Sequence, residues 1–254
     1  MKQYYEIKAQ NPDCILFFRM GDFFELFESD AEIASKILGL TLTSRNNGAS
    51  GATPLCGFPH HASDRYFPKM VAAGYKVAVC EQVEDPKLAK GIVKRAIVEV
   101  ISAGTSMNDG NLDAKVANYL CAVLPQKNSI AFAFADVTTG YFAVSESPIQ
   151  SFESEFARRM PKEVLVPQGV ELPRSIAEFV RAECILVTSV EEEHYALQNA
   201  AEVLLNHFKM ASVESLGLDG QDEKTRVAGA ILWYLIDQKK SELSHHFSRF
   251  CLRR

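Results

Sequence analysis

The first hundred residues alternate between short apolar runs of strand length and stretches in which apolar residues recur at helical spacing. The apolar runs predict strands over 14–18, 23–27, 41–44, 75–83 and 92–101. The helical spacing predicts helices over 1–10, from Ser29 to Gly39 and from Ala62 to Gly74. This order predicts a mixed α/β domain that closes near residue 105.

Local signals mark where some of these elements begin and end. Ser29 and Asp30 are predicted to cap the second helix, because short polar side chains bind the free amide groups there. Gly39 is predicted to end it, because glycine tolerates the backbone conformation that follows a helix. Residues 46–54 read Asn-Asn-Gly-Ala-Ser-Gly-Ala-Thr-Pro, a composition that predicts a flexible loop.

The second half begins with three strand-like runs joined by short turns, which predict an antiparallel meander over 118–124, 129–136 and 139–144. Helix and strand then alternate, with helices over 152–160 and 172–182, strands over 163–166 and 184–188, and further helices over 192–208 and 224–239. A meander followed by alternating helix and strand is the order of a ribonuclease-H-like fold. We therefore predict domains over 1–105 and 116–240, a polar linker over 106–115, and a tail or the start of a next region over 241–254.

Composition narrows the class of protein. Hydrophobic residues make up 47% and charged residues 23%, which is ordinary for a globular protein. The start does not resemble a signal peptide, and no apolar run has the length of a membrane span, so we expect a cytoplasmic protein without a membrane partner. The net charge of −5 disfavours a non-specific DNA-coating protein. Six cysteines without a Cys-x-x-Cys pair indicate no metal framework or disulfide framework.

Residues 23–27 carry the most informative chemistry. Side chains alternate along a strand, so Phe23 and Glu25 point to the same side. An aromatic ring and a carboxylate in this arrangement could stack on a base and hydrogen-bond its edge. The alternative is ordinary strand packing beside a solvated charge. A carboxylate pressed against a base should have a raised pKa and could donate a hydrogen bond as the neutral acid.

A set of motifs in fixed order bears on this choice: residues 3–8, 11–13, 16–27, 40–45, 56–62 and 79–82. Together they closely resemble the amino-terminal mismatch-binding domain of the MutS family of DNA mismatch repair proteins. Residues 136–142, Asp-Val-Thr-Thr-Gly-Tyr-Phe, resemble the connector domain of that family. The resemblance implies an α/β fold, with a mixed-sheet mismatch-binding domain followed by a ribonuclease-H-like connector domain.

The resemblance also implies roles for individual residues and partners. Phe23 would be a wedge at the lesion and Glu25 its hydrogen-bonding companion. The residues expected near DNA beside them are Met20, Asp22, Arg45, Asn46, Pro54 and Leu55. The expected partners are mismatched double-stranded DNA and, through the connector, a MutL-type protein. The full-length family forms homodimers and holds ATP and Mg²⁺ in a part absent here, so we expect this chain to be monomeric and without a cofactor or catalytic site.

Other residues suggest other functions. Asp136 lies in the predicted ribonuclease-H-like fold, where nucleases use clustered carboxylates to hold metal ions, but the neighbouring strands are mostly apolar. The adjacent His60 and His61 are expected to cap or pack rather than to hold a metal. No Gly-Lys dipeptide occurs, so a phosphate-binding P-loop is missing. An interaction module that docks repair partners without binding mismatches remains the alternative function.

Overall fold

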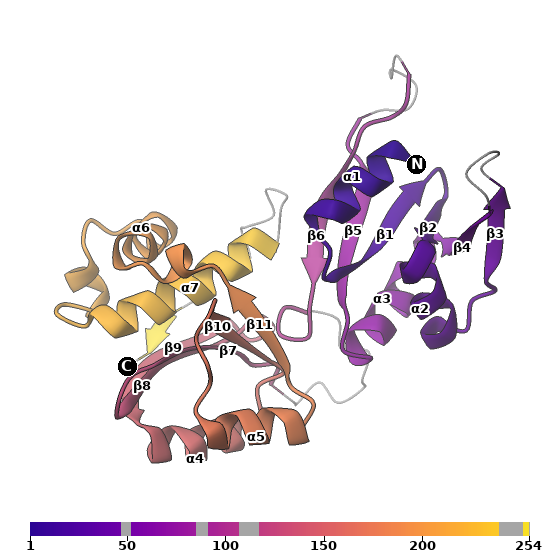
Figure 1. Ribbon diagram of the computed structural model, residues 1–254. Coiled ribbons are helices and arrows are strands. Elements are labelled where there is room, and N and C mark those ends of the chain that lie inside the picture. Colours follow the sequence, from indigo (N-terminus) through magenta and orange to yellow (C-terminus); the bar gives the residue numbers. More distant parts are fainter. Residues whose placement is uncertain (47–51, 85–90, 107–116, 239–250, 254) are drawn as a thin grey trace. The chain divides into compact units, whose positions relative to one another are not determined.

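The computed structural model describes residues 1–46, 52–84, 91–106, 117–238 and 251–253 (Figure 1). The chain divides into two compact units: 1–112 with 239–241, and 113–238 with 242–254. Apart from residue 106, the predicted linker over 106–115 lies outside the described residues. In the described parts of the chain, no helix combines the length and the apolar character needed to cross a bilayer.

The first unit is built on a six-stranded mixed sheet with the strand order β3-β4-β2-β1-β5-β6. Its strands are β1 (Cys14–Met20), β2 (Phe23–Phe27), β3 (Thr43–Asn46), β4 (Ala52–Pro59), β5 (Lys76–Gln82) and β6 (Arg95–Ile101). Strands β1 and β5 are parallel, and the other neighbouring pairs are antiparallel. The predicted mixed α/β domain is therefore confirmed.

Helices cover the two faces of this sheet unequally. The helices are α1 (Lys2–Gln10), α2 (Glu28–Leu38) and α3 (Ser63–Ala72), with a 3-10 turn η2 (His60–Ala62) before α3. Figure 1 shows α2 and α3 together, and they share one apolar cluster with the inner residues of β1, β2, β4 and β5. On the other face, Tyr4 of α1 packs against Phe18 and Phe27. Because one short helix covers little of a six-stranded sheet, part of that face stays open.

The predicted start of α2 is wrong. The helix begins at Glu28 and has no side-chain cap, whereas its end at Gly39, in the left-handed conformation (φ 68°), is confirmed. Asp30 is buried instead, and its carboxylate accepts hydrogen bonds from the Leu16 amide and from Lys8 Nζ, both at 2.9 Å. Burial with two donors satisfies this charge, which is why it does not need to serve as a cap.

The predicted loop over 46–54 is also corrected at both ends. Asn46 belongs to β3 and pairs with Ala52, the first residue of β4; residues 47–51 lie outside the described residues. Strand β4 was not predicted, since its proline and glycine residues have low strand propensity. Pairing with β2 on one side and β3 on the other supplies the hydrogen bonds that stabilise it.

The second unit has a six-stranded sheet with the order β11-β10-β7-β8-β9-β12. Its strands are β7 (Leu120–Pro125), β8 (Ser129–Asp136), β9 (Tyr141–Pro148), β10 (Glu163–Pro167), β11 (Leu186–Val190) and β12 (Cys251–Arg253). Strands β7, β8 and β9 form the predicted antiparallel meander, and β10 and β11 add to it in parallel. This is the predicted ribonuclease-H-like order.

Helices lie on both faces of the second sheet (Figure 1). They are α4 (Ile149–Arg159), α5 (Arg174–Ala182), α6 (Leu197–Phe208) and α7 (Asp222–Gln238), with 3-10 turns η3 (Glu192–Tyr195) and η4 (Val213–Leu216). Side chains from α4 and α5 form one apolar cluster with the sheet, and those from α6 and α7 form another. The single helix predicted over 192–208 is wrong, because Ala196 is extended and separates η3 from α6.

The tail predicted over 241–254 contains a short strand. Residues 251–253 form β12, which pairs in parallel with β9 at the edge of the sheet. Residues 239–250 and 254 lie outside the described residues.

Candidate nucleic-acid interface

The open part of the first sheet lies around the β1–β2 hairpin. Phe23, Glu25 and Phe27 alternate onto the same face of β2. Phe27 is sealed beneath α1, with its ring centroid 4.9 Å from that of Tyr4. Phe23, at the other end of the strand, has 47% of its surface exposed, whereas the next residue, Phe24, has 2%. One strand face therefore runs from the core to an exposed aromatic ring.

Glu25 lies between these two rings and is partly buried. Its Cα pairs with Phe18 of β1 and with Gly57 of β4. A Cβ atom at residue 57 would lie 2.7 Å from the Phe24 carbonyl oxygen and 3.5 Å from Glu25 Cγ, so only glycine fits beside this side chain. An isolated glycine within a strand often marks such a close approach, but the sequence did not indicate it here because β4 was not predicted.

The Glu25 carboxyl group has a buried oxygen, Oε2, with no hydrogen-bond partner among the described residues. Burial raises the pKa of Glu25, and the positive charges of Arg45 and Arg95 oppose that rise. The neutral acid is therefore favoured more than in an ordinary glutamate. A neutral carboxyl group can donate one hydrogen bond, and Oε2 has no acceptor among the described residues.

Two arginines flank Glu25 from opposite edges of the sheet. Arg45 of β3 is exposed. Arg95 of β6 reaches over the Phe18 ring, with its guanidinium carbon 5.2 Å from the ring centroid. Its Nε donates to the Arg19 carbonyl oxygen at 2.6 Å, which fixes its position. Sequence analysis did not identify Arg95, because its side chain comes near Glu25 only through the tertiary pairing of β1, β5 and β6.

The remaining predicted residues are placed as follows. Met20 pairs with Phe23 across the hairpin, and Asp22 is exposed in the turn between them. Leu55 alternates onto the same face as Glu25, whereas Pro54, one residue earlier, lies on the opposite face. The structure therefore brings Leu55 to this surface and does not bring Pro54. Asn46 is the last residue of β3 and pairs with Ala52, the first residue of β4.

Asp136, the candidate for nuclease chemistry, ends β8 in the second unit and is fully buried. Its Oδ1 accepts hydrogen bonds from the Thr138 amide at 2.9 Å and from Thr138 Oγ1 at 2.6 Å. These bonds shape the turn that leads into β9. Asp136 belongs to no group of converging metal ligands in the part of the chain that the structure describes.

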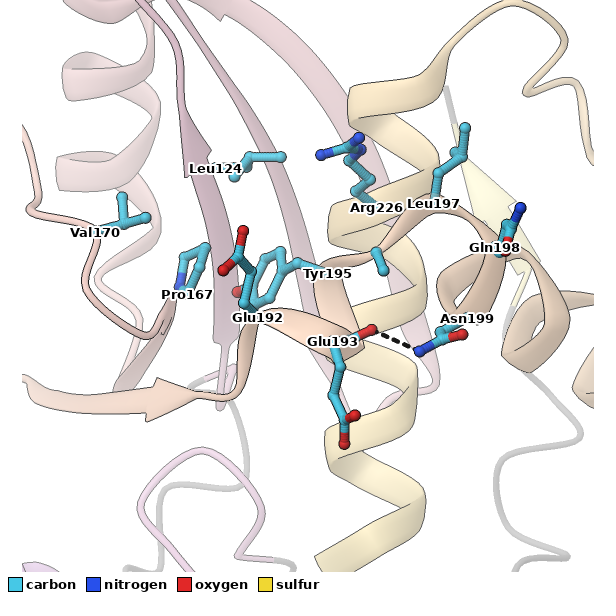
Figure 2. Close-up of a pocket in the computed structure, with 11 residues that line it drawn as sticks. Leu124, Pro167, Val170, Glu192, Glu193, Tyr195, Leu197, Gln198, Asn199 and Arg226 are labelled. Carbon is cyan, nitrogen blue, oxygen red and sulfur yellow. Dashed lines mark hydrogen bonds between the residues drawn. The ribbon is translucent and has the colours of Figure 1, made fainter.

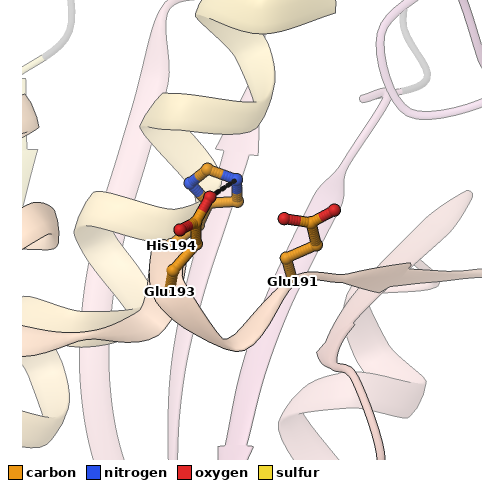
Figure 3. Close-up of side chains that lie close together, drawn as sticks. All are labelled: Glu191, Glu193 and His194. Carbon is orange, nitrogen blue, oxygen red and sulfur yellow. Dashed lines mark ion pairs between the residues drawn. The ribbon is translucent and has the colours of Figure 1, made fainter.

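Glu191, Glu193 and His194 form the one such group found among the described residues, with ligand atoms within 4.8 Å of one another (Figure 3). Both carboxylates are exposed, and His194 Nε2 lies 3.6 Å from Glu193 Oε1. The His194 ring stacks on Trp233, with 3.4 Å between ring centroids. An exposed acidic turn of this kind is ordinary for a protein surface.

The second unit also has a cavity of about 620 Å³ at the ends of β7 and β10 (Figure 2). Apolar side chains such as Leu124 and Pro167 line one side, and the start of α6 lines the other. Asn199 Nδ2 donates to the Glu193 carbonyl oxygen at 2.9 Å on this rim. Arg226 of α7 contributes a buried Nε that has no hydrogen-bond partner among the described residues.

Comparison with family models defines the class of protein. Residues 1–110 match the model described as MutS domain I, and residues 118–246 match the model described as MutS domain II. The two matches follow the order of the two units. The chain belongs to the MutS family, and the resemblance noted in the sequence is confirmed.

Curated relatives give the same answer. The protein named DNA mismatch repair protein MutS from Chlorobaculum parvum is 42% identical over 250 residues, which is 96% of this chain and 28% of that protein. The protein of the same name from Desulfatibacillum aliphaticivorans is 40% identical over 248 residues, again 96% and 28%. The chain thus spans about 28% of the length of these relatives. Among solved structures, a Fowlpox virus resolvase in complex with Holliday junction DNA covers 47% of this chain at 14% identity, but its TM-score of 0.32 supports no argument.

Proposed function

We propose that the first unit recognises mismatched or unpaired bases in duplex DNA, as part of a MutS-type mismatch repair protein. Phe23 inserts into the base stack at the lesion, and Glu25 hydrogen-bonds the edge of the displaced base. This proposal depends on the exposure of Phe23. Its exposed fraction is 47%, whereas that of the next residue, Phe24, is 2%. An exposed aromatic ring beside a partly buried acid is costly in water and suits a ligand with a flat apolar face.

The energy of insertion explains why a damaged pair would be preferred. Stacking of a base on an aromatic side chain contributes about 1–3 kcal/mol, whereas bending a binding site costs roughly 1–6 kcal/mol. A wedge therefore cannot offset the larger deformations of an intact duplex. A mispaired base is easier to unstack, so the same ring suffices there. The protein discriminates by the weakness of the lesion and needs no sequence information.

Glu25 acts as a filter in this proposal. The partly buried carboxyl group, with its raised pKa, donates a hydrogen bond to a base that has been displaced toward it. An intact duplex offers no such base and brings only phosphates, which repel the charged form. Arg45 lies on the β3 side of Glu25, and its exposed guanidinium suits a phosphate contact.

The test is a titration of this chain against fluorescent duplexes with a G·T mismatch, with an unpaired T, or fully matched, at one stated salt concentration. Phe23→Ala should lower the preference for the G·T duplex roughly five- to 150-fold, since it removes one stacking contact. Tyr75→Ala is the matched control. Tyr75 is also exposed (36%) but precedes β5 at the end of the sheet away from the hairpin. Equal binding of all three duplexes that survives Phe23→Ala unchanged would refute the proposal.

The second unit supports a partner-docking role, which is also the alternative function for the whole chain. A MutL-type protein is the proposed partner. The cavity beside α6 favours docking, because a buried Arg226 Nε without an acceptor suits a carbonyl or carboxylate from another chain. Arg226→Met should weaken capture of a MutL-type protein while leaving mismatch preference unchanged. Docking without any mismatch preference would favour the alternative. We propose no catalytic step for this chain.

A further inference from the structure

The two turn residues that precede Phe23 both accept hydrogen bonds, through their carbonyl oxygens, from residues outside the turn. The turn consists of Gly21, which is in the left-handed conformation (φ 58°), and Asp22. Arg19 Nε donates to the Gly21 oxygen at 2.5 Å. His60 donates to the Asp22 oxygen through its main-chain amide at 2.8 Å, and its ring Nδ1 lies 3.1 Å from the same oxygen. Arg19 of β1 and His60 of η2 thus meet at the two positions before Phe23.

The Arg19 side chain is itself anchored on the face of the sheet that α2 and α3 cover. Its NH1 lies 3.2 Å from Oε1 and 3.3 Å from Oε2 of Glu81 on β5. The side chains of this pair are only 16% and 32% exposed, so water screens it less than a surface pair. The Arg19 guanidinium carbon also lies 5.7 Å from the centroid of the Phe24 ring. The turn is therefore connected through one side chain to a strand on the far side of β1.

His60 holds the turn from the other side. It is the first residue of η2 and directly follows Pro59, the partner of Phe23 in the β2–β4 ladder. A carbonyl oxygen can only accept, so the ring nitrogen Nδ1 must carry the proton in this contact.

We propose that Arg19 and His60 are positioning residues that clamp the Gly21–Asp22 turn and so fix the direction in which Phe23 enters the duplex. The inference rests on the proposed function, since a clamp matters only if Phe23 is a wedge. Stacked bases resist separation, so they exert a force on the inserted ring. A two-residue turn without additional hydrogen bonds would move under that force. Ordering the turn before binding also removes an entropy cost from the complex. In this role neither side chain has to touch DNA.

The variants separate the two arms of the clamp. His60→Ala removes the ring contact and keeps the main-chain hydrogen bond, and His61→Ala removes the neighbouring exposed ring as a matched control. Arg19→Met removes the hydrogen bond to the Gly21 oxygen. Glu81→Gln weakens the ion pair that positions Arg19, without altering any group that contacts the turn. Glu81→Gln is the second route if Arg19→Met fails to fold. His60→Gln keeps a side-chain donor at this position, so it should retain the mismatch preference that His60→Ala lowers.

The measurements are the ratio of matched to G·T dissociation constants and the fluorescence of 2-aminopurine placed beside the mismatch, which reports unstacking. Each clamp variant should lower the ratio roughly two- to twelve-fold, the range expected for one net hydrogen bond, and should lower the 2-aminopurine signal. In a Phe23→Ala background the same substitutions should change nothing further, because they act through that ring. A purely structural role would not vanish in this background.

The outcomes distinguish this inference from the proposed function. If Phe23→Ala abolishes the preference while Arg19→Met, Glu81→Gln and His60→Ala all retain it, the clamp is refuted and the wedge stands. If the clamp variants have the same effect with and without Phe23, they act by another route and the inference is refuted. If Phe23→Ala itself changes nothing, the proposed function fails and the clamp fails with it.

Discussion

The pH dependence of mismatch preference is the sharpest test of Glu25. Burial raises the pKa of Glu25 in the free protein, so the neutral acid persists to higher pH than in an ordinary glutamate. In the proposed complex this neutral form donates the hydrogen bond to the base. Raising the pH through the pKa removes the proton, which removes the donor and leaves a charge facing the DNA. Mismatch preference should therefore fall as the pH rises.

The size of the effect follows from the single unpaired oxygen, Glu25 Oε2. One net hydrogen bond contributes about 0.5–1.5 kcal/mol, so its loss should reduce mismatch preference roughly two- to twelve-fold between the acidic and basic limits. Glu25→Gln keeps an N–H donor and cannot titrate in this range. Its preference should be flat with pH and close to that of the parent at its acidic limit.

The assay is fluorescence anisotropy with G·T and matched duplexes at constant ionic strength, from about pH 5 to about pH 8.5. NMR of ¹³C-labelled carboxyl groups gives the Glu25 titration in the free protein. Arg45 lowers this pKa, so Arg45→Met should move the titration to higher pH. A parent preference that is independent of pH, or one that rises with pH, would refute the role of Glu25 as a neutral donor.

The same shift predicts a change in stability without DNA. A carboxyl group whose pKa is raised in the folded state contributes stability that is fully present below its unfolded pKa and is lost as the pH rises through the folded pKa. Glu25→Gln removes this loss. The variant should therefore unfold at higher urea than the parent near neutral pH, and the difference should vanish in acid.

Two further substitutions test the internal contacts of the protein, one in each unit. Gly229→Ala should destabilise the second unit by about 1–3 kcal/mol, because its Cβ would lie 2.3–2.5 Å from Ala200 Cα, Cβ and O where α7 crosses α6. Urea unfolding followed through Trp233, the one tryptophan of the chain, measures this, and an unchanged midpoint would show that the helices can separate. Asp30→Ala should destabilise the first unit by about 3–5 kcal/mol, since it leaves Lys8 and the Leu16 amide without their buried acceptor. Amide hydrogen exchange at residue 16 reports this locally, and retained protection there would contradict the assigned hydrogen bond.

Local patterns in the sequence determined much of the fold. Alternation placed Phe23 and Glu25 on one face of β2, because the pleat of a strand allows no other arrangement. Gly39 ended α2, because the left-handed conformation at that point costs glycine little. The order of runs in the second half, a meander and then alternating helix and strand, predicted the ribonuclease-H-like fold but not β12 at the edge of its sheet. Each of these depends on residues that are neighbours in the chain.

Tertiary structure alone decided the environment of the site. The unpaired oxygen of Glu25 and the direction of its pKa shift depend on strands β1 and β4 beside it and on arginines from β3 and β6. Strand β4 exists because two neighbouring strands pair with it, against its own composition, and that pairing turns Leu55 toward the site and Pro54 away from it. Such pairings join residues far apart in the chain, and no local periodicity encodes which strands meet or in which register.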